Sequence, residues 1–365
     1  MTQKTNPQIS TDTNLTAYAT PRDQKHLVRL PAEWEPQDGV LLAWPCPGSD
    51  WDPILPEIEA VLVDIIRHTI AFENIIIVAP ELQRTASILQ KHGLNSASIR
   101  LFEIDNNDTW ARDFGPIGVE IDAKLHLLDF GFNGWGLKFP ADLDNQINKN
   151  LAAAGAWKVP LLTQGLILEG GSIESDGKGT LLTTTECLLS PNRNPHLSKQ
   201  ALESRLKETF GATQILWLNH GALVGDDTDG HIDTLARLCP NDTIAYVRCD
   251  DPADEHFETM QALEQELRLF KTLQGRNYTL VALPWPQPAF DHNQQRLPAT
   301  YANFLVINGA VLVPTYADPA DAEALRIIGT VYPGRKIIGI DCSSVILQHG
   351  SLHCLTMQLP EGTLA

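Results

Sequence analysis

The chain of 365 residues is 43% hydrophobic and 20% charged, which excludes a disordered protein and fits one large globular domain or two ordinary ones. Its 45 acidic and 27 basic residues give a net charge of −18, which disfavours nucleic acid and anionic membranes as partners. The same field attracts a small cationic substrate, although such a charge more often serves solubility. The six cysteines lack disulfide-framework or CxxC spacing, so we expect reduced thiols in a cytoplasmic protein.

The N-terminal segment is polar and has no apolar core of a secretory signal, and no apolar run approaches the length of a membrane span. We therefore predict a flexible tail over residues 1–25. No low-complexity linker divides the remainder, so residues 26–365 are expected to form a single catalytic α/β domain.

The first hundred residues predict alternating strands and helices, an α/β pattern. Asp52 is a candidate helix cap, and Pro53 suits a first helical turn. The expected elements are a strand Val40–Trp44, a helix from Pro53 through Phe72, a strand Asn74–Ala79, a helix about Glu81–His92 and a strand near Ser98–Glu103.

Strand pairs then alternate with single helices along the chain. The expected helical segments are Asp142–Ala154, Ser198–Phe210, Asp254–Leu273 and Pro319–Ile328. The expected strands are Ile117–Glu120, Leu125–Asp129, segments around Leu166, Ser172 and Leu181, Ile215–Leu218, Ile232–Leu238, Thr243–Arg248, Tyr278–Leu283, Ala302–Ile307, Ala310–Pro314, Lys336–Ile340 and His353–Gln358.

Five polar residues recur at intervals of 56, 62, 72 and 51 residues, namely Asp113, Glu169, His231, Asn303 and Cys354. Each stands beside glycine, proline or an aromatic residue, as functional residues in loops often do. About one such residue falls in each block of two or three strands and a helix. We infer a ring of similar units that direct these residues at one central site, although the blocks share no evident sequence similarity.

Cys354 is the candidate nucleophile. A thiol has a pKa near 8.5 and needs a base or positive charge nearby, and His231 is the candidate partner. On the predicted strand His353 and Cys354 alternate, so they are expected to point to opposite faces. The competing interpretation is a buried core thiol, since buried cysteines are common.

His231 and Asp233, in the sequence GHID, are expected to project from the same face of an extended segment, as a base and a neighbouring carboxylate. A capped turn with a surface histidine remains an alternative. A metal site is disfavoured because no third ligand lies at short spacing.

The segment NNDTWARDFGP contributes further candidates. On a strand Asp113 faces the site while Arg112 points away. Trp110 suits a planar cation through stacking and cation–π attraction, or belongs to the core. Asp108 in the same segment is a further candidate for substrate binding.

Two carboxylates, an aromatic ring, a histidine and a cysteine together describe a site for a guanidinium group, whose fork of N–H donors matches carboxylates. Asp113 and Asp233 would hold it on opposite edges while Cys354 attacks its carbon. The bound cation would itself favour the thiolate by Coulomb attraction.

The sequence resembles the agmatine deiminase and bacterial-type peptidyl-arginine deiminase family, within the guanidine-modifying superfamily. The resemblance rests on the motifs LPAEWEPQDGVLLAWP, NDTWARDFGP, GFNGWG, LEGGSIESDGKGTLLTTTECLLSPNRNP, GHIDTLAR, YANFLVINGAVLVPTY and SLHCLTMQLP, in this order. It covers nearly the whole chain after Leu27. It implies the five-bladed, pseudo-symmetric α/β propeller built from ββαβ units, the pentein fold.

The resemblance also implies a mechanism. Cys354 adds to the guanidinium carbon, His231 protonates the leaving ammonia, and His231 then activates water to release the ureido product from a thiouronium intermediate. Asp113 and Asp233 clamp the guanidinium, and Glu169 hydrogen-bonds and orients His231.

Two further roles follow from the same resemblance. Asn303 matches the family's amide near the thiol, and Trp110 matches its aromatic wall. No metal or organic cofactor is implied.

The expected reaction is hydrolysis of agmatine to N-carbamoylputrescine and ammonia. The peptidyl-arginine branch neutralises a substrate carboxylate with arginines about twenty residues past the RD motif, where this chain has Lys138 as its one base. Arg237 stands where typical agmatine deiminases are more apolar. A peptidyl-arginine deiminase, an amidinotransferase and a non-catalytic binding protein for cationic amines remain alternatives, and a homodimer stays open. The order His, Asn, Cys disfavours a papain-like protease.

Overall fold

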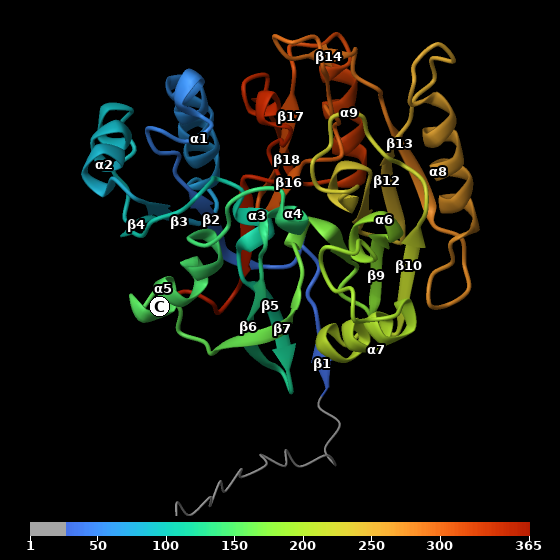
Figure 1. Ribbon diagram of the computed structural model, residues 1–365, viewed down its shortest axis with the longest axis horizontal. Coiled ribbons are helices and arrows are strands. Elements are labelled where there is room, and N and C mark those ends of the chain that lie inside the picture. The colour runs from blue at the N-terminus through green and yellow to red at the C-terminus, as the bar shows by residue number, and fades with distance from the viewer. Residues whose placement is uncertain (1–26) are drawn as a thin grey trace, which may run out of the picture.

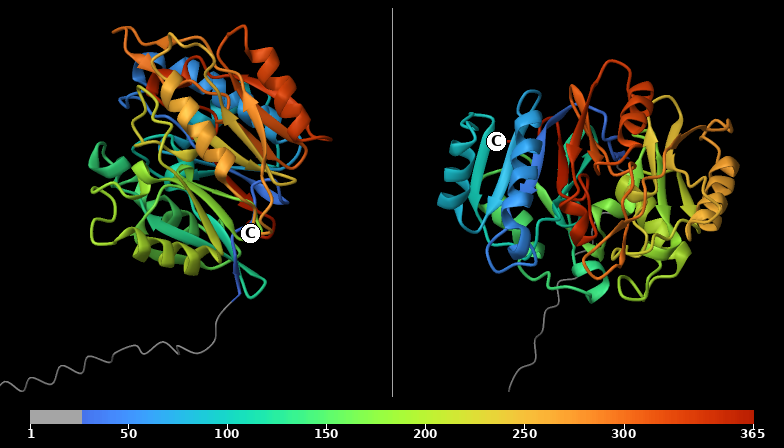
Figure 2. Two further views of the ribbon diagram at one scale, coloured as in Figure 1. Left: turned by 90° about the vertical axis from the view of Figure 1, so that its right-hand side faces the viewer. Right: turned by 90° about the horizontal axis from the view of Figure 1, so that it is seen from above.

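A computed structural model describes residues 27–365. The predicted tail, 1–25, lies outside the described residues. Helices α1 (Leu55–Thr69) and α2 (Leu82–Lys91) lie at one end of the molecule and α8 (Phe257–Leu269) at the other, with strands between them (Figures 1 and 2).

Within residues 27–365 the strands form five sheets of three or four strands and one two-stranded sheet. The first two sheets contain β1 (Val28–Arg29), β5 (Ile117–Ile121), β6 (Lys124–Gly131) and β7 (Leu161–Ile167), and β8 (Ile173–Ser175), β9 (Thr180–Thr184) and β10 (Gln214–Leu218). The next two contain β11 (Ala236–Cys239), β12 (Thr243–Val247) and β13 (Thr279–Leu283), and β16 (Leu305–Ile307), β17 (Ala310–Thr315) and β18 (Lys336–Asp341). The last two contain β2 (Gln37–Ala43), β3 (Asn74–Ala79), β4 (Ile99–Glu103) and β19 (Thr356–Pro360), and β14 (Ala289–Phe290) and β15 (Arg296–Leu297).

The five larger sheets repeat one pattern, in which an antiparallel pair is extended by a parallel strand. A parallel connection has to cross from one end of the sheet to the other, and here a helix lies in each of these crossovers. These helices are α1, α5 (Ile147–Ala153), α7 (Lys199–Phe210), α8 and α9 (Asp321–Val331). The α/β class and the alternation of strand pairs with single helices are thereby confirmed.

The last strand, β19, joins the sheet of β2, β3 and β4. β19 pairs antiparallel with β2, with Thr356 opposite Leu42, so the segment around Cys354 lies beside the start of the described chain. Cys354 belongs to one buried apolar cluster and Ile232 to a second. The candidate residues therefore lie where the two cores meet.

Several local predictions are wrong, and most of them concern the candidate site. His353 and Cys354 lie in a turn before β19 rather than in the strand, and the GHID segment forms a 3₁₀ turn, Ile232–Thr234, before β11. The WARD segment is a helical turn, α3 (Ala111–Phe114), rather than a strand. The side-chain directions expected from the alternation along a strand are wrong here, because tight turns set the directions instead.

The helix predicted from Pro53 begins as a 3₁₀ turn, Asp52–Ile54, and continues as α1. Asp52 does not cap it, since its carboxylate accepts from the Gly48 amide. The other short helical segments are α4 (Gly134–Leu137), α6 (Thr185–Leu188) and the 3₁₀ turns Asp144–Gln146, Gly170–Ser172 and Val345–Gln348.

In the part of the chain that the structure describes, we find no helix of the length and apolarity that a bilayer crossing requires.

Gly211 ends α7 in the left-handed conformation, at φ 67°, and a Cβ there would lie 1.8 Å from the carbonyl oxygen of Val28. We predict that Gly211→Ala lowers the free energy of unfolding by about 3 kcal/mol, because left-handed strain and a backbone clash add. Gly275→Ala is the control: its φ is 79° but nothing lies within 4 Å, so about 1 kcal/mol is expected. Equal losses in denaturant titrations would contradict the role of the close contact.

Candidate active site

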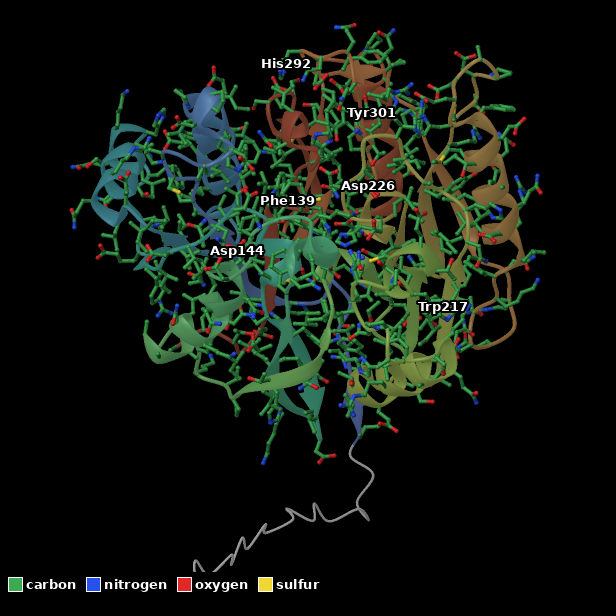
Figure 3. The ribbon with its side chains drawn as sticks, viewed as in Figure 1. Phe139, Asp144, Trp217, Asp226, His292 and Tyr301 are labelled. Atoms are coloured by element: carbon green, nitrogen blue, oxygen red, sulfur yellow. The ribbon has the colours of Figure 1, made fainter. Side chains whose placement is uncertain are left out.

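Cys354 lines a cavity of about 180 Å³ whose wall is acidic and aromatic. The acids are Asp50, Asp108, Asp113, Asp226 and Asp227, and the aromatic residues are Trp110, Trp135 and Phe139. Figure 3 places Phe139 and Asp226 near the middle of the molecule. A pocket of this composition suits a cation with an apolar stem.

The Cys354 thiol is held by Asn303, which precedes β16. The Asn303 Nδ2 lies 3.3 Å from Sγ, and its Oδ1 accepts from the backbone amides of His353 at 2.8 Å and Cys354 at 3.3 Å. One amide side chain thus fixes both the sulfur and the turn that carries it. The sequence predicted an amide at the thiol, and the structure brings the two together.

Asp233 lies between Cys354 and His353. Its Oδ2 is 2.7 Å from His353 Nδ1 and 4.0 Å from the Cys354 sulfur. The prediction that His353 and Cys354 point to opposite faces is therefore wrong, because the turn brings both to one carboxylate. The other oxygen, Oδ1, is buried and has no hydrogen-bond partner among the described residues, as expected of an acceptor that awaits a ligand.

Asp113 is fixed by two donors. Its Oδ1 accepts from the Gly171 amide at 3.0 Å, and its Oδ2 accepts from Trp135 Nε1 at 2.8 Å. His231 Nδ1 lies 3.6 Å from Oδ1. Trp135 was not singled out from the sequence, although it stands in the GFNGWG motif that carries the resemblance.

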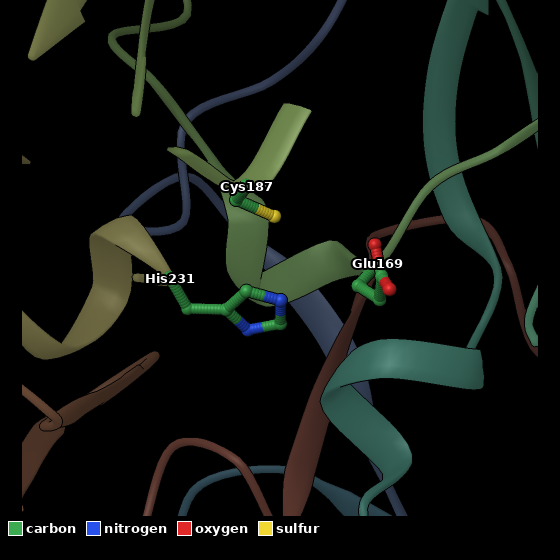
Figure 4. A group of neighbouring side chains, drawn as sticks. All are labelled: Glu169, Cys187 and His231. Atoms are coloured by element: carbon green, nitrogen blue, oxygen red, sulfur yellow. The ribbon is translucent and has the colours of Figure 1, made fainter. Parts of the chain in front are cut away.

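His231 is fully buried, and neither ring nitrogen has a hydrogen-bond partner in residues 27–365. Figure 4 shows the ring beside Glu169 and the Cys187 thiol, and atoms of the three groups lie within 4.8 Å of one another. The predicted bond from Glu169 to His231 is not formed. The Glu169 oxygens accept instead from Arg193 Nε, at 2.9 and 3.0 Å, since a guanidinium is the stronger partner for a carboxylate.

Trp110 and Asp108 line the cavity as the sequence predicted for substrate-binding residues. The Trp110 ring packs against Trp51 at 5.5 Å between centroids. Asp108 Oδ1 accepts from Trp51 Nε1 at 2.8 Å and from the Thr109 amide at 2.7 Å. Asp108 therefore fixes the aromatic wall as well as adding negative charge.

Gly171 is the residue around which the acids and the histidine converge. A Cβ at this position would lie 2.7 Å from His231 Nδ1, 2.9 Å from Asp113 Oδ1 and 3.1 Å from Asp233 Oδ2. The absence of a side chain thus permits three polar groups from two distant segments to approach. It is the second glycine of the LEGG sequence, in which the sequence analysis singled out Glu169.

Two clusters in the described chain have the spacing of metal ligands, Glu169 with Cys187 and His231, and Glu33 with Glu174 and His353. In each of them an arginine already holds carboxylate oxygens: Arg193 binds Glu169, and Arg237 binds Glu33 and Glu174. The guanidinium groups supply the positive charge that these carboxylates need.

Comparison with known proteins shows the family of this chain. The family model of Porphyromonas-type peptidyl-arginine deiminases matches residues 29–360. The chain belongs to this family. An agmatine deiminase of Pseudomonas aeruginosa (strain LESB58) is 32% identical over 356 residues, 91% of this chain and 95% of that protein.

Two solved structures are also similar to this member of the peptidyl-arginine deiminase family. One, provisionally assigned as a peptidyl-arginine deiminase, is 47% identical with a TM-score of 0.89, over 92% of this chain and 99% of its own. The other is a variant of the C. jejuni agmatine deiminase with substrate bound, 39% identical with a TM-score of 0.85, over 92% and 97%.

The two aspartates of this family member are driven to opposite protonation states. Burial and the charge of Asp233 raise the pKa of Asp113 well above its usual range. Burial acts in the same direction on Asp233, but the hydrogen bond from His353 and the charge of Arg237 outweigh it and hold the pKa of Asp233 below its ordinary value. The pair therefore carries one negative charge until a cation enters.

The nucleophile and base candidates are neutral in the free protein. Burial lowers the pKa of His231 to about 3. Burial, Asp233 and Asp113 raise the pKa of the Cys354 thiol well above its ordinary value. A thiolate needs a positive charge close by, so a cationic substrate would activate the group that attacks it.

We predict that Asp233→Asn shifts the pH midpoint for iodoacetamide alkylation of Cys354 to lower pH. The carboxylate beside the sulfur disfavours the thiolate, so its removal lowers the thiol pKa and speeds alkylation at pH 8. Peptide mass spectrometry measures the rate, with Cys46 as internal standard because burial and acids other than Asp233 raise the pKa of its thiol. An unchanged or raised midpoint would show that Asp233 does not act on the thiol.

We predict that Gly171→Ala lowers kcat/KM about 100-fold, because the methyl group displaces His231 and Asp113 from their positions. Gly165→Ala is the control, since the nearest atom to its Cβ lies 4.0 Å away. Steady-state kinetics and thermal unfolding of both variants separate a site defect from a loss of fold. Full activity of Gly171→Ala would show that the convergence is not required.

Proposed function

We propose that this protein hydrolyses agmatine to N-carbamoylputrescine and ammonia through a covalent intermediate on Cys354. The observation that carries the proposal is that Cys354 and Asp113 line one acidic cavity, with Asp233 Oδ2 4.0 Å from the thiol and His231 Nδ1 3.6 Å from Asp113 Oδ1. Asp233 Oδ1 and both His231 nitrogens are buried and unpartnered among the described residues. A guanidinium group supplies the donors and the charge that these atoms need.

The first half-reaction breaks a C–N bond. The guanidinium binds between Asp113 and Asp233, which favours release of the Asp113 proton to solvent and ionisation of the thiol. The Cys354 sulfur adds to the guanidinium carbon as its proton passes to His231. His231 then gives this proton to the departing amino group, and ammonia leaves the thiouronium.

The second half-reaction restores the thiol. His231 takes a proton from water, and the resulting hydroxide adds to the thiouronium carbon. The C–S bond breaks as the ureido carbonyl forms, the hydroxyl proton passes to the Asp113 carboxylate, and the proton on His231 returns to the sulfur. The Glu169 carboxylate is bound by Arg193 and does not bind His231 directly. It therefore acts on the reaction through its charge.

The charges around the cavity favour agmatine over a substrate that carries a carboxylate. Lys138, the one base near the expected position, contacts Asp229 Oδ1 at 2.5 Å and the Asp227 carbonyl at 2.6 Å, so its charge is already balanced. The remaining acids on the wall, among them Asp108 and Asp226, suit the terminal amine of agmatine.

We also propose that the five repeated sheet units form a pseudo-symmetric five-bladed propeller of ββαβ units in one domain. The repeated strand pattern and the pairing of β19 with β2 support this arrangement. The six unpaired cysteines support a reducing, cytoplasmic location.

The proposal predicts ammonia release from agmatine and at least about 10³-fold less activity in Cys354→Ala and Cys354→Ser, because the covalent route is lost. Cys249→Ser, another buried cysteine, is the control. Free arginine and arginyl peptides are expected to be poor substrates.

Each alternative gives a different result. Equal turnover of a peptide with C-terminal arginine would make the protein a peptidyl-arginine deiminase. Guanidinoacetate formed on adding glycine would show amidino transfer. Agmatine that protects Cys354 from alkylation without ammonia release would show a binding protein.

A further inference from the structure

His353, next to the thiol in sequence, joins the candidate site to a second group of buried charges. Its Nδ1 lies 2.7 Å from Asp233 Oδ2, while its Nε2 lies 2.9 Å from Glu33 Oε2 and 3.1 Å from Arg237 Nη2. All four side chains are buried or nearly so. The imidazole thus lies between Asp233 on one side and a cluster of buried charged side chains on the other.

The ion cluster consists of Glu33, Glu174 and Arg237, and it fixes the imidazole from behind. Arg237 contacts Glu33 Oε2 at 2.6 Å and Glu174 Oε1 at 2.5 Å, and it donates to the carbonyls of Ala302 and Phe304. These contacts come from segments far apart in the sequence. Because the planar guanidinium is bound on several sides, it holds the ring it touches in one place.

We propose that His353 is a positioning residue that fixes the Asp233 carboxylate for the guanidinium of the substrate, and that Arg237, itself bound by Glu33, fixes His353 in turn. This inference rests on the proposed deiminase function. By binding Oδ2, the imidazole leaves Oδ1 free to face the substrate. It also keeps Asp233 ionised before the cation arrives.

The protonation state follows from the neighbours. Nδ1 faces a carboxylate oxygen and therefore carries a proton. Nε2 faces both an acceptor, Glu33, and a donor, Arg237; burial and the charges of Arg112 and Arg237 lower the pKa of His353, which favours the neutral ring that accepts from Arg237. The imidazole is thus held in the tautomer that donates to Asp233.

Two amide substitutions test the contacts of the two ring nitrogens separately. An asparagine amide nitrogen is as many bonds from the backbone as Nδ1, so His353→Asn keeps a donor toward Asp233. A glutamine amide nitrogen matches Nε2, so His353→Gln keeps a group toward the ion cluster and loses the donor at Asp233. His353→Ala removes both.

We expect His353→Asn to keep kcat/KM for agmatine within about 10-fold of the unmodified protein, and His353→Gln and His353→Ala to lose about 100-fold because Asp233 is no longer fixed. In the Cys354→Ser background, calorimetry should show weaker agmatine binding with His353→Gln than with His353→Asn. This second readout does not depend on turnover.

Loss of activity in His353→Asn as large as in His353→Gln would overturn the proposal, and so would full activity of His353→Gln. If thermal unfolding shows that His353→Gln does not fold, the activity of His353→Asn alone tests the proposal. Any role of His353 other than donation to Asp233 predicts that His353→Asn is inactive. Failure of the unmodified protein to release ammonia from agmatine would instead refute the proposed function.

Discussion

Asp113 and Asp233 are both buried and both act on the Cys354 thiol, and their mutual repulsion governs the site. Two buried carboxylates close to one histidine and one cysteine are unfavourable unless one is protonated or a cation enters. The fold itself stabilises one of the two negative charges, because His353 binds the Asp233 carboxylate. The second charge becomes favourable when a guanidinium binds, so the same event that places the substrate activates the nucleophile.

The turns around the cavity maintain this arrangement at a cost in backbone strain. In α4, Gly134, Trp135, Gly136 and Leu137 all have positive φ, which non-glycine residues adopt at a cost of about 1 kcal/mol or more. The strained turn places Trp135 Nε1 on Asp113, and the ring is held by edge contacts with Phe132 and Phe139. Aromatic packing therefore stabilises a conformation whose purpose is to direct one donor at one carboxylate.

Regular elements were predictable from the sequence because burial fixes their periodicity: the strand Asn74–Ala79 was predicted with the bounds that β3 has. The recurring polar residues were also predictable, and the structure brings Cys354, Asn303 and Asp233 together. The directions of the side chains were not predictable, since a turn directs both His353 and Cys354 toward Asp233. The partner of Glu169 was also missed, because Arg193 lies 24 residues away and shows no local pattern.

Two fully buried acids of the site, Glu169 and Asp233, are each bound by a buried basic side chain. Glu169 is bound by Arg193, which also binds Asp229, the partner of Lys138. Asp233 is bound by His353, behind which Arg237 and Glu33 lie. Buried ion pairs contribute little net stability once desolvation is counted, so their value here is geometric. They hold each carboxylate in one orientation and protonation state, which a site that recognises a flat, fixed-charge group requires.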